Sequence, residues 1–373
     1  MGAPVCPPHY LDKSQRNLMR NRKTVYALIA IVALMAGSAV QNRRLAEHRW
    51  ERLPEAGVTY SANVPPALTF VMAGLGGFRG VVSEILWFRI ARLQDEGRYL
   101  ELVQLADWIT RLDPHASEGW VYNAWNLAYN VSVMMSREED RWRWVQSGIS
   151  LLRDEGLRFN PRDARLYREL AWLYQNKIGD VLDSAHLTYK FHLLEAMSPC
   201  VRPDGTLDVA AAATGARLAE LRLDAERMLE LERRFGPLDW RLPETHALYW
   251  ADMGMPYARD AERVMCRRAV YLPLMLSVFR GRFVGSQEER KWRVEPNLAL
   301  AVPAADYMLL ALEENRTSNQ TRTTLRYLTE VTRMLAQAGH DEDAKELYGR
   351  LVGAMPPPHQ PPMYEDVLKG WEP

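Results

Sequence analysis

The strongest constraint on this fold is a recurring order of glycine, helical segment and proline. In residues 97–114, GRYLELVQLADWITRLDP, apolar residues recur at helical spacing between Gly97 and Pro114, which are 17 residues apart. Near the other end of the chain, Gly339 lies 17 residues before Pro356 across a similar pattern. Since glycine permits a tight turn and proline ends a helix, both segments are predicted to be the second helix of a helix pair.

Further helix pairs are predicted between these two segments. The best match joins LYRELAWLYQNKIGD to SAHLTYKFHLLEAMSP, and another copy reads THALYWADMGMPYARDAERVMCRRAVYLP. The unit ending at Pro161 lies 47 residues after the previous proline, so it contains an insertion or longer helices. The residues that define the predicted copies are Gly97, Pro114, Pro161, Tyr174, Ala185, Ala261, Pro273, Gly339, Ala344 and Pro356.

These copies resemble the tetratricopeptide repeat (TPR), a pair of helices with a small residue at their crossing and a proline near the end. Tyr167 and Tyr174 fall on its W-x2-L-G-x2-Y pattern, and Ala185 and Tyr189 on its A-x3-F pattern. Residues 74–114 also look like the start of bacterial membrane-anchored repeat proteins that have no assigned activity. The resemblance implies an all-α, TPR-like helical-repeat solenoid.

Residues 24–40, TVYALIAIVALMAGSAV, are uncharged and have basic residues on both sides. Seventeen helical residues span roughly 25 Å, which predicts a single N-terminal transmembrane helix. A cleaved signal peptide, with Gly37-Ser38-Ala39 as the cleavage site, and a buried core helix are the alternatives. Five basic residues before the segment against four after it favour a cytoplasmic N-terminus, with the bulk on the periplasmic side of the inner membrane.

The expected organisation is a basic tail, the anchor, a linker, repeats, an irregular region, a last repeat and a proline-rich tail. Their ranges are 1–23, 24–40, 41–66, 67–205, 206–296, 297–357 and 358–373. In the irregular region, one long helix is predicted over 207–235 and a polar loop over 280–296.

Composition and motifs argue against several kinds of function. Lys and Arg total 47, as do Asp and Glu, so no basic surface for nucleic acid is expected. Cys6, Cys200 and Cys266 form no CxxC pair, which argues against a zinc site, although a Cys200–Cys266 disulfide stays open. GLGGFRG at 74–80 lacks the G-x-G-x-x-G spacing. We therefore expect no enzyme activity, no metal and no cofactor.

The resemblance implies a groove lined by the first helix of each pair. One groove position is tryptophan in three copies, at Trp125, Trp172 and Trp250. Other groove positions are Trp87, Arg165 and Arg168, and in the last copy Arg326, Thr329 and Arg333. An aromatic strip with arginines suits extended peptides or a partner helix, whereas the alternative is that these tryptophans are interhelical core.

The sequence therefore predicts a non-catalytic, membrane-anchored scaffold that binds protein or peptide partners. The alternatives are a module that binds a cell-envelope glycan or other ligand, and an accessory subunit of a membrane transport or enzyme complex.

Overall fold

The computed structural model describes residues 25–26, 29, 37, 79–356 and 361–373. The predicted tail, anchor and linker over 1–66 lie outside the described residues, apart from four isolated positions within 24–40. Within the described part of the chain, no helix is both long enough and apolar enough to cross a bilayer. The described residues are mostly helical, so the prediction of an all-α fold is confirmed.

The chain divides into two compact units. The first unit contains α3 (Arg79–Asp95) and residues 111–113, and the second contains residues 97–110 and 114–373. The first half of the second unit contains most of α4 (Tyr99–Leu112), then α5 (Ser117–Trp125), η2 (Asn126–Val131), η3 (Ser132–Met134), α6 (Glu138–Ser150), η4 (Leu151–Gly156), α7 (Leu157–Phe159), α8 (Ala164–Trp172), η5 (Leu173–Ile178), α9 (His186–Met197) and η6 (Ser198–Cys200).

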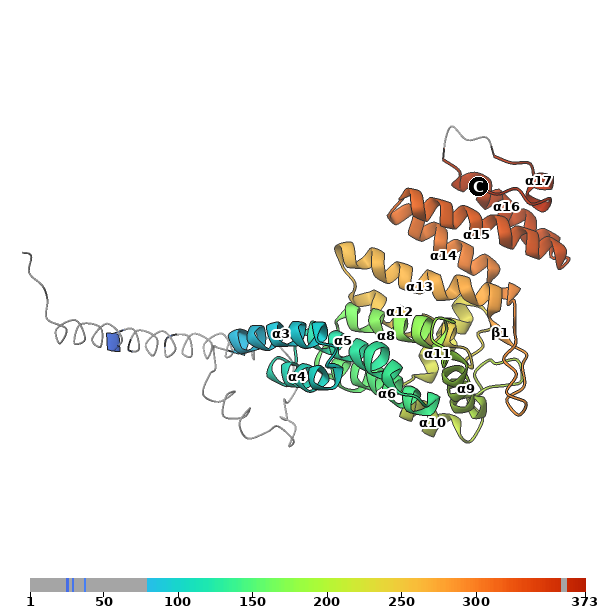
Figure 1. The fold of residues 1–373 in the computed structure, drawn as a ribbon. Coiled ribbons are helices and arrows are strands. Elements are labelled where there is room, and N and C mark those ends of the chain that lie inside the picture. Colours follow the sequence, from blue (N-terminus) through green and yellow to red (C-terminus); the bar gives the residue numbers. More distant parts are fainter. Residues whose placement is uncertain (1–24, 27–28, 30–36, 38–78, 357–360) are drawn as a thin grey trace, which may run out of the picture. The chain divides into compact units, whose positions relative to one another are not determined.

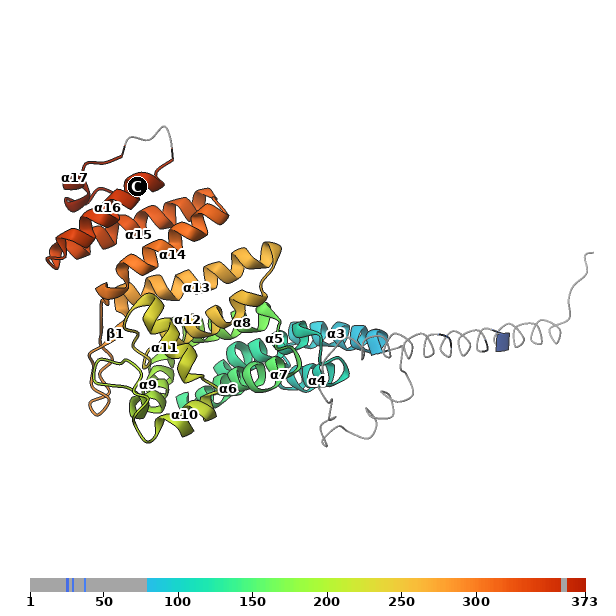
Figure 2. The same cartoon turned by 180° about the vertical axis from the view of Figure 1, so that it is seen from behind.

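The second half of this unit is also helical, with one short hairpin of β1 (Arg282–Phe283) and β2 (Val294–Glu295). Its helices are α10 (Thr214–Leu221), α11 (Ala225–Phe235), α12 (Pro243–Gly254), η7 (Met255–Tyr257), α13 (Asp260–Arg280), η8 (Leu298–Leu300), α14 (Ala301–Glu314), α15 (Ser318–Gln337), α16 (Asp341–Ala354) and α17 (Tyr364–Leu368). From α12 to α16, each helix packs against the next one along the chain (Figures 1 and 2).

Two consecutive stretches of the second unit have the same build. The first copy (Ser117–Phe159) begins with α5 and a π-helical turn, η2, and the second copy (Ala164–Met197) begins with α8 and a π-helical turn, η5. The α-helical parts have nine residues each and the π-helical parts six. Equivalent residues are 47 apart, as in the contact of Glu118 with Arg165. Long helices, without a separate insertion, therefore account for the spacing of 47.

A shared contact relates a third copy (Pro243–Arg280, α12 to α13) to these two. Trp120 Nε1 donates to the carbonyl of Pro114, six residues earlier, at 2.9 Å. Tyr167 and Thr245 make the same contact through their hydroxyls, at 3.0 Å to Pro161 and 2.8 Å to Asp239. In each copy, this bond holds the turn that precedes the first helix.

Prolines and glycines mark several of the helix ends. Pro114, Pro161 and Pro356 each lie two residues beyond the last residue of a helix. Gly97 and Gly339 have positive φ values of 69° and 81°, a conformation that favours glycine. Pro273 is different, because α13 continues through it to Arg280. The prediction of a helix end at Pro273 is therefore wrong.

Packing explains why α13 departs from the predicted register. Its buried stripe runs through Cys266, Val270 and Leu274, at successive intervals of four residues. Val270 and Leu274 belong to the main hydrophobic core, and Cys266 packs in a smaller cluster with Ala164 and Ala258. This burial stabilises the helix although Pro273 has no N–H to donate. Ala261 lies off this stripe and is exposed, so it is not the small residue at a helix crossing. Ala185 and Ala344, in contrast, are fully buried.

The irregular region also differs from the prediction. A single helix over 207–235 is wrong, because Arg222 has a left-handed φ of 55° and ends α10. The Asp224 side chain then caps α11 by accepting from the Arg227 N–H at 2.8 Å. Within 280–296, the two strands pair Phe283 with Val294. Cys200 and Cys266 are both free and buried, so they do not form a disulfide.

Candidate interaction surface

The candidate surface lies where the first helices of the first and second copies run side by side. Trp125 ends α5 and Trp172 ends α8, and each precedes a π-helical turn. Each side chain is 37% exposed. We call these tryptophans, with Tyr129, Glu169 and the Glu118–Arg165 pair, the tryptophan strip. Large aromatic side chains that stay this exposed on ordered helices are candidates for contact with a partner.

Hydrogen bonds and ring contacts fix the orientation of the strip. Trp125 Nε1 donates to Oε2 of Glu169 at 3.1 Å, and its ring lies 4.7 Å from that of Tyr129 between centroids. The Tyr129 hydroxyl donates to Oδ1 of Asn176 at 2.9 Å. Burial raises the pKa of Tyr129, so this hydroxyl keeps its proton at neutral pH. Trp125 and Tyr129 are therefore held in place within the protein, and such fixed groups lower the entropy cost of binding a partner.

Charged residues flank the aromatic groups. Arg165 Nη1 lies 2.6 Å from Oε1 of Glu118, which joins α8 to α5. Arg168 Nη2 lies 2.9 Å from Oε1 of Glu169, and its Nη1 lies 4.0 Å from Oε1 of Glu262 on α13. Of the two predicted arginines, Arg165 belongs to the strip and Arg168 lies beside it, and both are paired with carboxylates. They provide a polar rim rather than free positive charge.

A buried ion pair lies next to the strip. Lys177 Nζ is 2.5 Å from Oδ2 of Asp183 and 5.1 Å from the ring centroid of Tyr129. Burial lowers the pKa of Lys177. Burial alone would raise the pKa of Asp183, but hydrogen bonds from Lys177 and from the Ala185 N–H lower it overall. The ion pair joins η5 to the loop that precedes α9. Because Lys177 also contacts the Tyr129 ring, the pair helps to fix the position of that ring.

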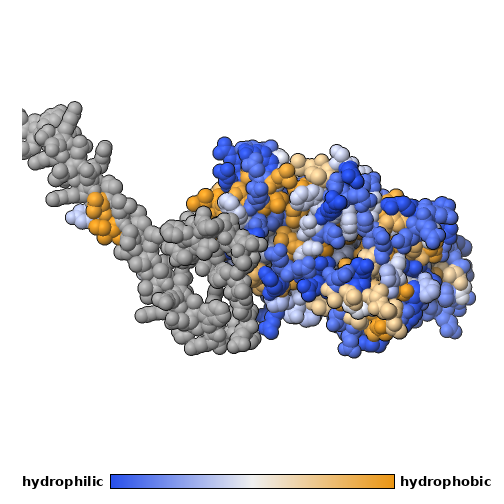
Figure 3. Space-filling view, turned by 90° about the horizontal axis from the view of Figure 1, so that it is seen from below, coloured by the Kyte–Doolittle hydropathy of each residue, from blue (hydrophilic) through white to orange (hydrophobic). Residues whose placement is uncertain are grey.

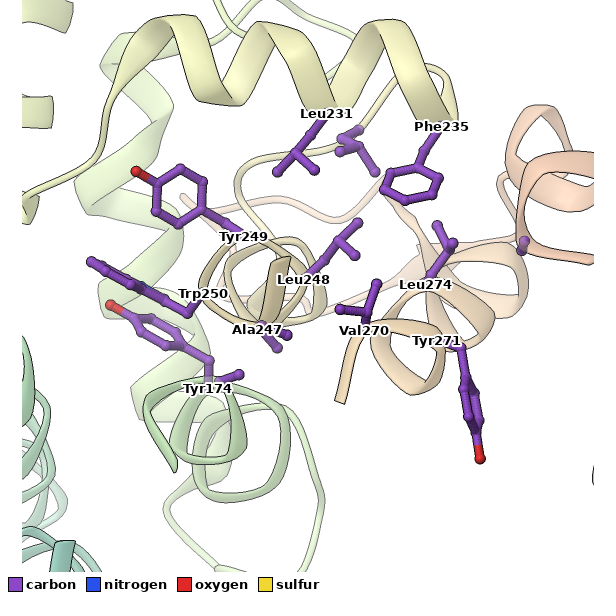
Figure 4. Close-up of a cluster of buried hydrophobic side chains, with 14 of the residues drawn as sticks. Tyr174, Leu231, Phe235, Ala247, Leu248, Tyr249, Trp250, Val270, Tyr271 and Leu274 are labelled. Atoms are coloured by element: carbon purple, nitrogen blue, oxygen red, sulfur yellow. The ribbon is translucent and has the colours of Figure 1, made fainter. Parts of the chain in front are cut away.

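Trp250 does not belong to this surface. It is only 4% exposed, and its ring centroid lies 5.1 Å from that of Tyr249 and 6.4 Å from that of Tyr167. Figure 4 shows it beside Tyr174, inside the buried cluster. The prediction that Trp250 lines a groove is wrong, because α12 packs against both α8 and α13. For Trp250, the alternative of interhelical core is the correct one.

Trp87 lies on α3, which belongs to the first unit, and its side chain is half-buried. Of the predicted site residues, the structure thus brings together Trp125, Trp172, Arg165 and Arg168. Sequence reasoning missed Tyr129, Glu169 and Asn176. Tyr129 and Asn176 occupy equivalent positions 47 residues apart and bind each other, but their side chains differ, so the spacing alone does not single them out.

The surface of the molecule is mostly polar on the face that Figure 3 shows. Figure 3 shows one face of the molecule, on which hydrophilic residues predominate and hydrophobic ones form separate patches. Within residues 79–356 and 361–373, no group of three His, Cys, Asp or Glu side chains could hold a metal ion. Comparison with known proteins adds no assignment: no protein-family model matches the chain, and no curated protein matches it.

Proposed function

We propose that the second unit is a non-catalytic protein-binding module, built as a TPR-like helical-repeat solenoid. The single observation that carries this proposal is the tryptophan strip. Two equivalent tryptophans, 37% exposed each, lie on adjacent helices, and Trp125 is oriented by its hydrogen bond to Glu169. Tryptophan is the residue type most enriched among the anchors of protein interfaces. The module therefore binds a peptide or a partner helix through these rings.

The membrane attachment is a further part of the proposal. Residues 24–40 anchor the chain in the inner membrane, with the second unit on the periplasmic side. The support for this is the uncharged stretch and its basic flanks in the sequence. The protein then acts as a scaffold that holds its partner at the membrane surface.

The proposal is tested by substituting both strip tryptophans in the full chain. Trp125→Ala with Trp172→Ala removes the proposed anchors, whereas Trp108→Ala on α4 removes a tryptophan of similar exposure, 38%, outside the strip. Partners are recovered from detergent-solubilised membranes by affinity capture and quantified by mass spectrometry. The double variant should lose roughly 2 kcal/mol or more of binding, about 30-fold in recovery at limiting concentration.

The Trp108→Ala control shows whether a loss of binding is specific to the strip tryptophans. Trp108→Ala should recover the same partner as the unaltered protein, and both variants should keep their helical circular dichroism. If the double variant recovers its partner normally, the strip is not the binding surface and the proposal fails.

A further inference from the structure

Helix α3 carries an exposed apolar pair, Ile85 and Phe88. Phe88 is the most exposed large apolar side chain on the described helices, at 77%, and Ile85 is 61% exposed. The two residues are three positions apart, so their side chains are neighbours on one side of the helix. Ile90 and Leu93 are buried and form a different side of α3. The helix therefore packs through one side and leaves two large apolar side chains on another.

Charge is distributed unevenly along this part of the chain. Residues 67–78, ALTFVMAGLGGF, contain no charged residue and directly precede α3. From Arg92 to Glu101, in contrast, five of ten residues are charged. Arg92 and Glu96 form an ion pair on the surface, with Nε 3.2 Å from Oε1. The C-terminal end of α3 therefore suits water, whereas the exposed apolar pair lies toward the uncharged stretch.

The place of α3 in the chain favours a lipid surface as the environment of the apolar pair. The continuous described part of the chain begins with α3 (Figure 1). Residues 41–78 separate it from the anchor proposed over 24–40, so α3 is the described helix closest to that anchor along the chain. Isoleucine and phenylalanine side chains partition into the boundary between headgroups and acyl chains. Arg89, next to Phe88, is exposed and has a long stem that can reach the headgroups.

The small area of the apolar pair argues against a stable protein interface. Two side chains expose at most a few hundred Å², well below the roughly 800 Å² that each partner buries in a stable complex. A bilayer is a different case, because an anchored chain is already held at its surface. A small additional apolar contact then suffices to orient the helix.

We propose that the side of α3 that carries Ile85 and Phe88 lies against the bilayer and inserts these two side chains at the level of the headgroups. This inference rests on the membrane anchor of the proposed function and deepens it. The contact holds the beginning of the first unit at the membrane, while the charged C-terminal end of α3 stays in water. It does not involve the tryptophan strip, which lies in the second unit.

The test uses the full chain in phosphatidylcholine vesicles, with an environment-sensitive fluorophore on one introduced cysteine. Phe88→Cys is combined with Cys6→Ser, because the other cysteines, Cys200 and Cys266, are buried. Leu182→Cys with Cys6→Ser is the matched control, since Leu182 is 80% exposed and belongs to the second unit. Phosphatidylcholine with a nitroxide near the headgroup should quench at least about half of the emission at position 88 and leave position 182 essentially unchanged.

A second pair of variants tests the apolar character of the contact. In the Phe88→Cys background, Ile85→Glu places a carboxylate beside the probe and should reduce the quenching by about two-fold or more, because an ionised group resists transfer from water. Val181→Glu is the matched control, since Val181 is 65% exposed and lies in the second unit. It should leave the quenching at position 88 unchanged.

Flotation of the vesicles separates this inference from the anchor on which it rests. A chain that does not float with the vesicles overturns both. A chain that floats, but whose probe at position 88 is quenched no more than the probe at position 182, overturns the lipid contact and leaves the anchor standing. Emission at position 88 that is shielded from water yet not quenched by the nitroxide also overturns the lipid contact, because a protein surface, such as a second copy of the chain, then covers the apolar pair.

Discussion

Trp172 and Trp250 occupy the same position in two copies of one helical pattern, yet their environments are opposite. Trp172 ends a helix at the surface and is 37% exposed, whereas Trp250 is 4% exposed on a helix with neighbours on both sides. Almost every residue of α12 is buried, including Glu244, His246 and Asp252. A repeat register identifies equivalent positions along the chain. The number of neighbouring helices decides which of them reach solvent.

The sharpest test of this comparison is alanine substitution at both positions. Trp250→Ala leaves a cavity among Tyr167, Tyr174 and Tyr249, so it should lower the free energy of unfolding by about 3–5 kcal/mol. Trp172→Ala should cost less than about 2 kcal/mol, because part of its ring already contacts water. Urea denaturation of the full chain, followed by circular dichroism, measures both values. Equal losses of unfolding free energy in the two variants would show that Trp172 is part of the core in the same way as Trp250.

A second prediction concerns the pH dependence of the buried helix. His246 is 1% exposed, and its Nε2 lies 2.9 Å from the carbonyl of Trp240. Its Nδ1 has no hydrogen-bond partner among the described residues, as suits a neutral ring that donates through Nε2. Burial lowers the pKa of His246 to about 4.

The sign of the effect follows from this lowered pKa. Below pH 6.5 the unfolded chain binds a proton at His246 that the folded protein does not bind, so stability falls as the pH drops from 6.5 toward 4. Between pH 7 and pH 5 the loss should be about 2 kcal/mol. His246→Gln should remove this part of the pH dependence in urea titrations at the two pH values. An unchanged difference between pH 7 and pH 5 in the variant would show that other groups cause it.

The smallest expected effect lies at the exposed rim. Arg165→Glu sets like charges against each other where Arg165 now faces Glu118, and should cost about 0.5–1 kcal/mol in low salt. The double reversal, Glu118→Arg with Arg165→Glu, should regain most of the loss. The same urea titrations measure this, and 0.5 M NaCl should suppress the difference. A loss of several kcal/mol would mean that this rim belongs to the core, as Trp250 does.

Local sequence predicted the features that local chemistry determines. The helices end before Pro114, Pro161 and Pro356, since proline cannot continue an N–H hydrogen-bond ladder. Pro273 follows the same local rule and yet lies within α13, because burial of Val270 and Leu274 outweighs its missing donor. The continuation of α13 through Pro273 therefore depends on tertiary packing, which the local sequence around the proline does not show.

The candidate site was predicted in part for the same reason. Trp125, Trp172, Arg165 and Arg168 could be found from their repeat positions. The exposure of the tryptophans to solvent could not be predicted from these positions, because the burial of Trp250 depends on how α8 and α13 enclose α12. Tyr129 and Glu169 were missed because they lie outside the groove positions that the resemblance implies. The TPR assignment and the anchor at 24–40 stay predictions.

The exact repetition of α5 and α8 at a spacing of 47 residues sets a scale for any ligand of the strip. Adjacent packed helices lie about 8–10 Å apart, and a peptide in the polyproline II conformation advances about 3.1 Å per residue and returns to the same face every third residue. A peptide that engages both tryptophans must therefore present two matching groups about three residues apart. Under the proposed function, the strip would therefore select the spacing of apolar residues in a partner, and one inserted or deleted residue between them would move the second group away from its tryptophan.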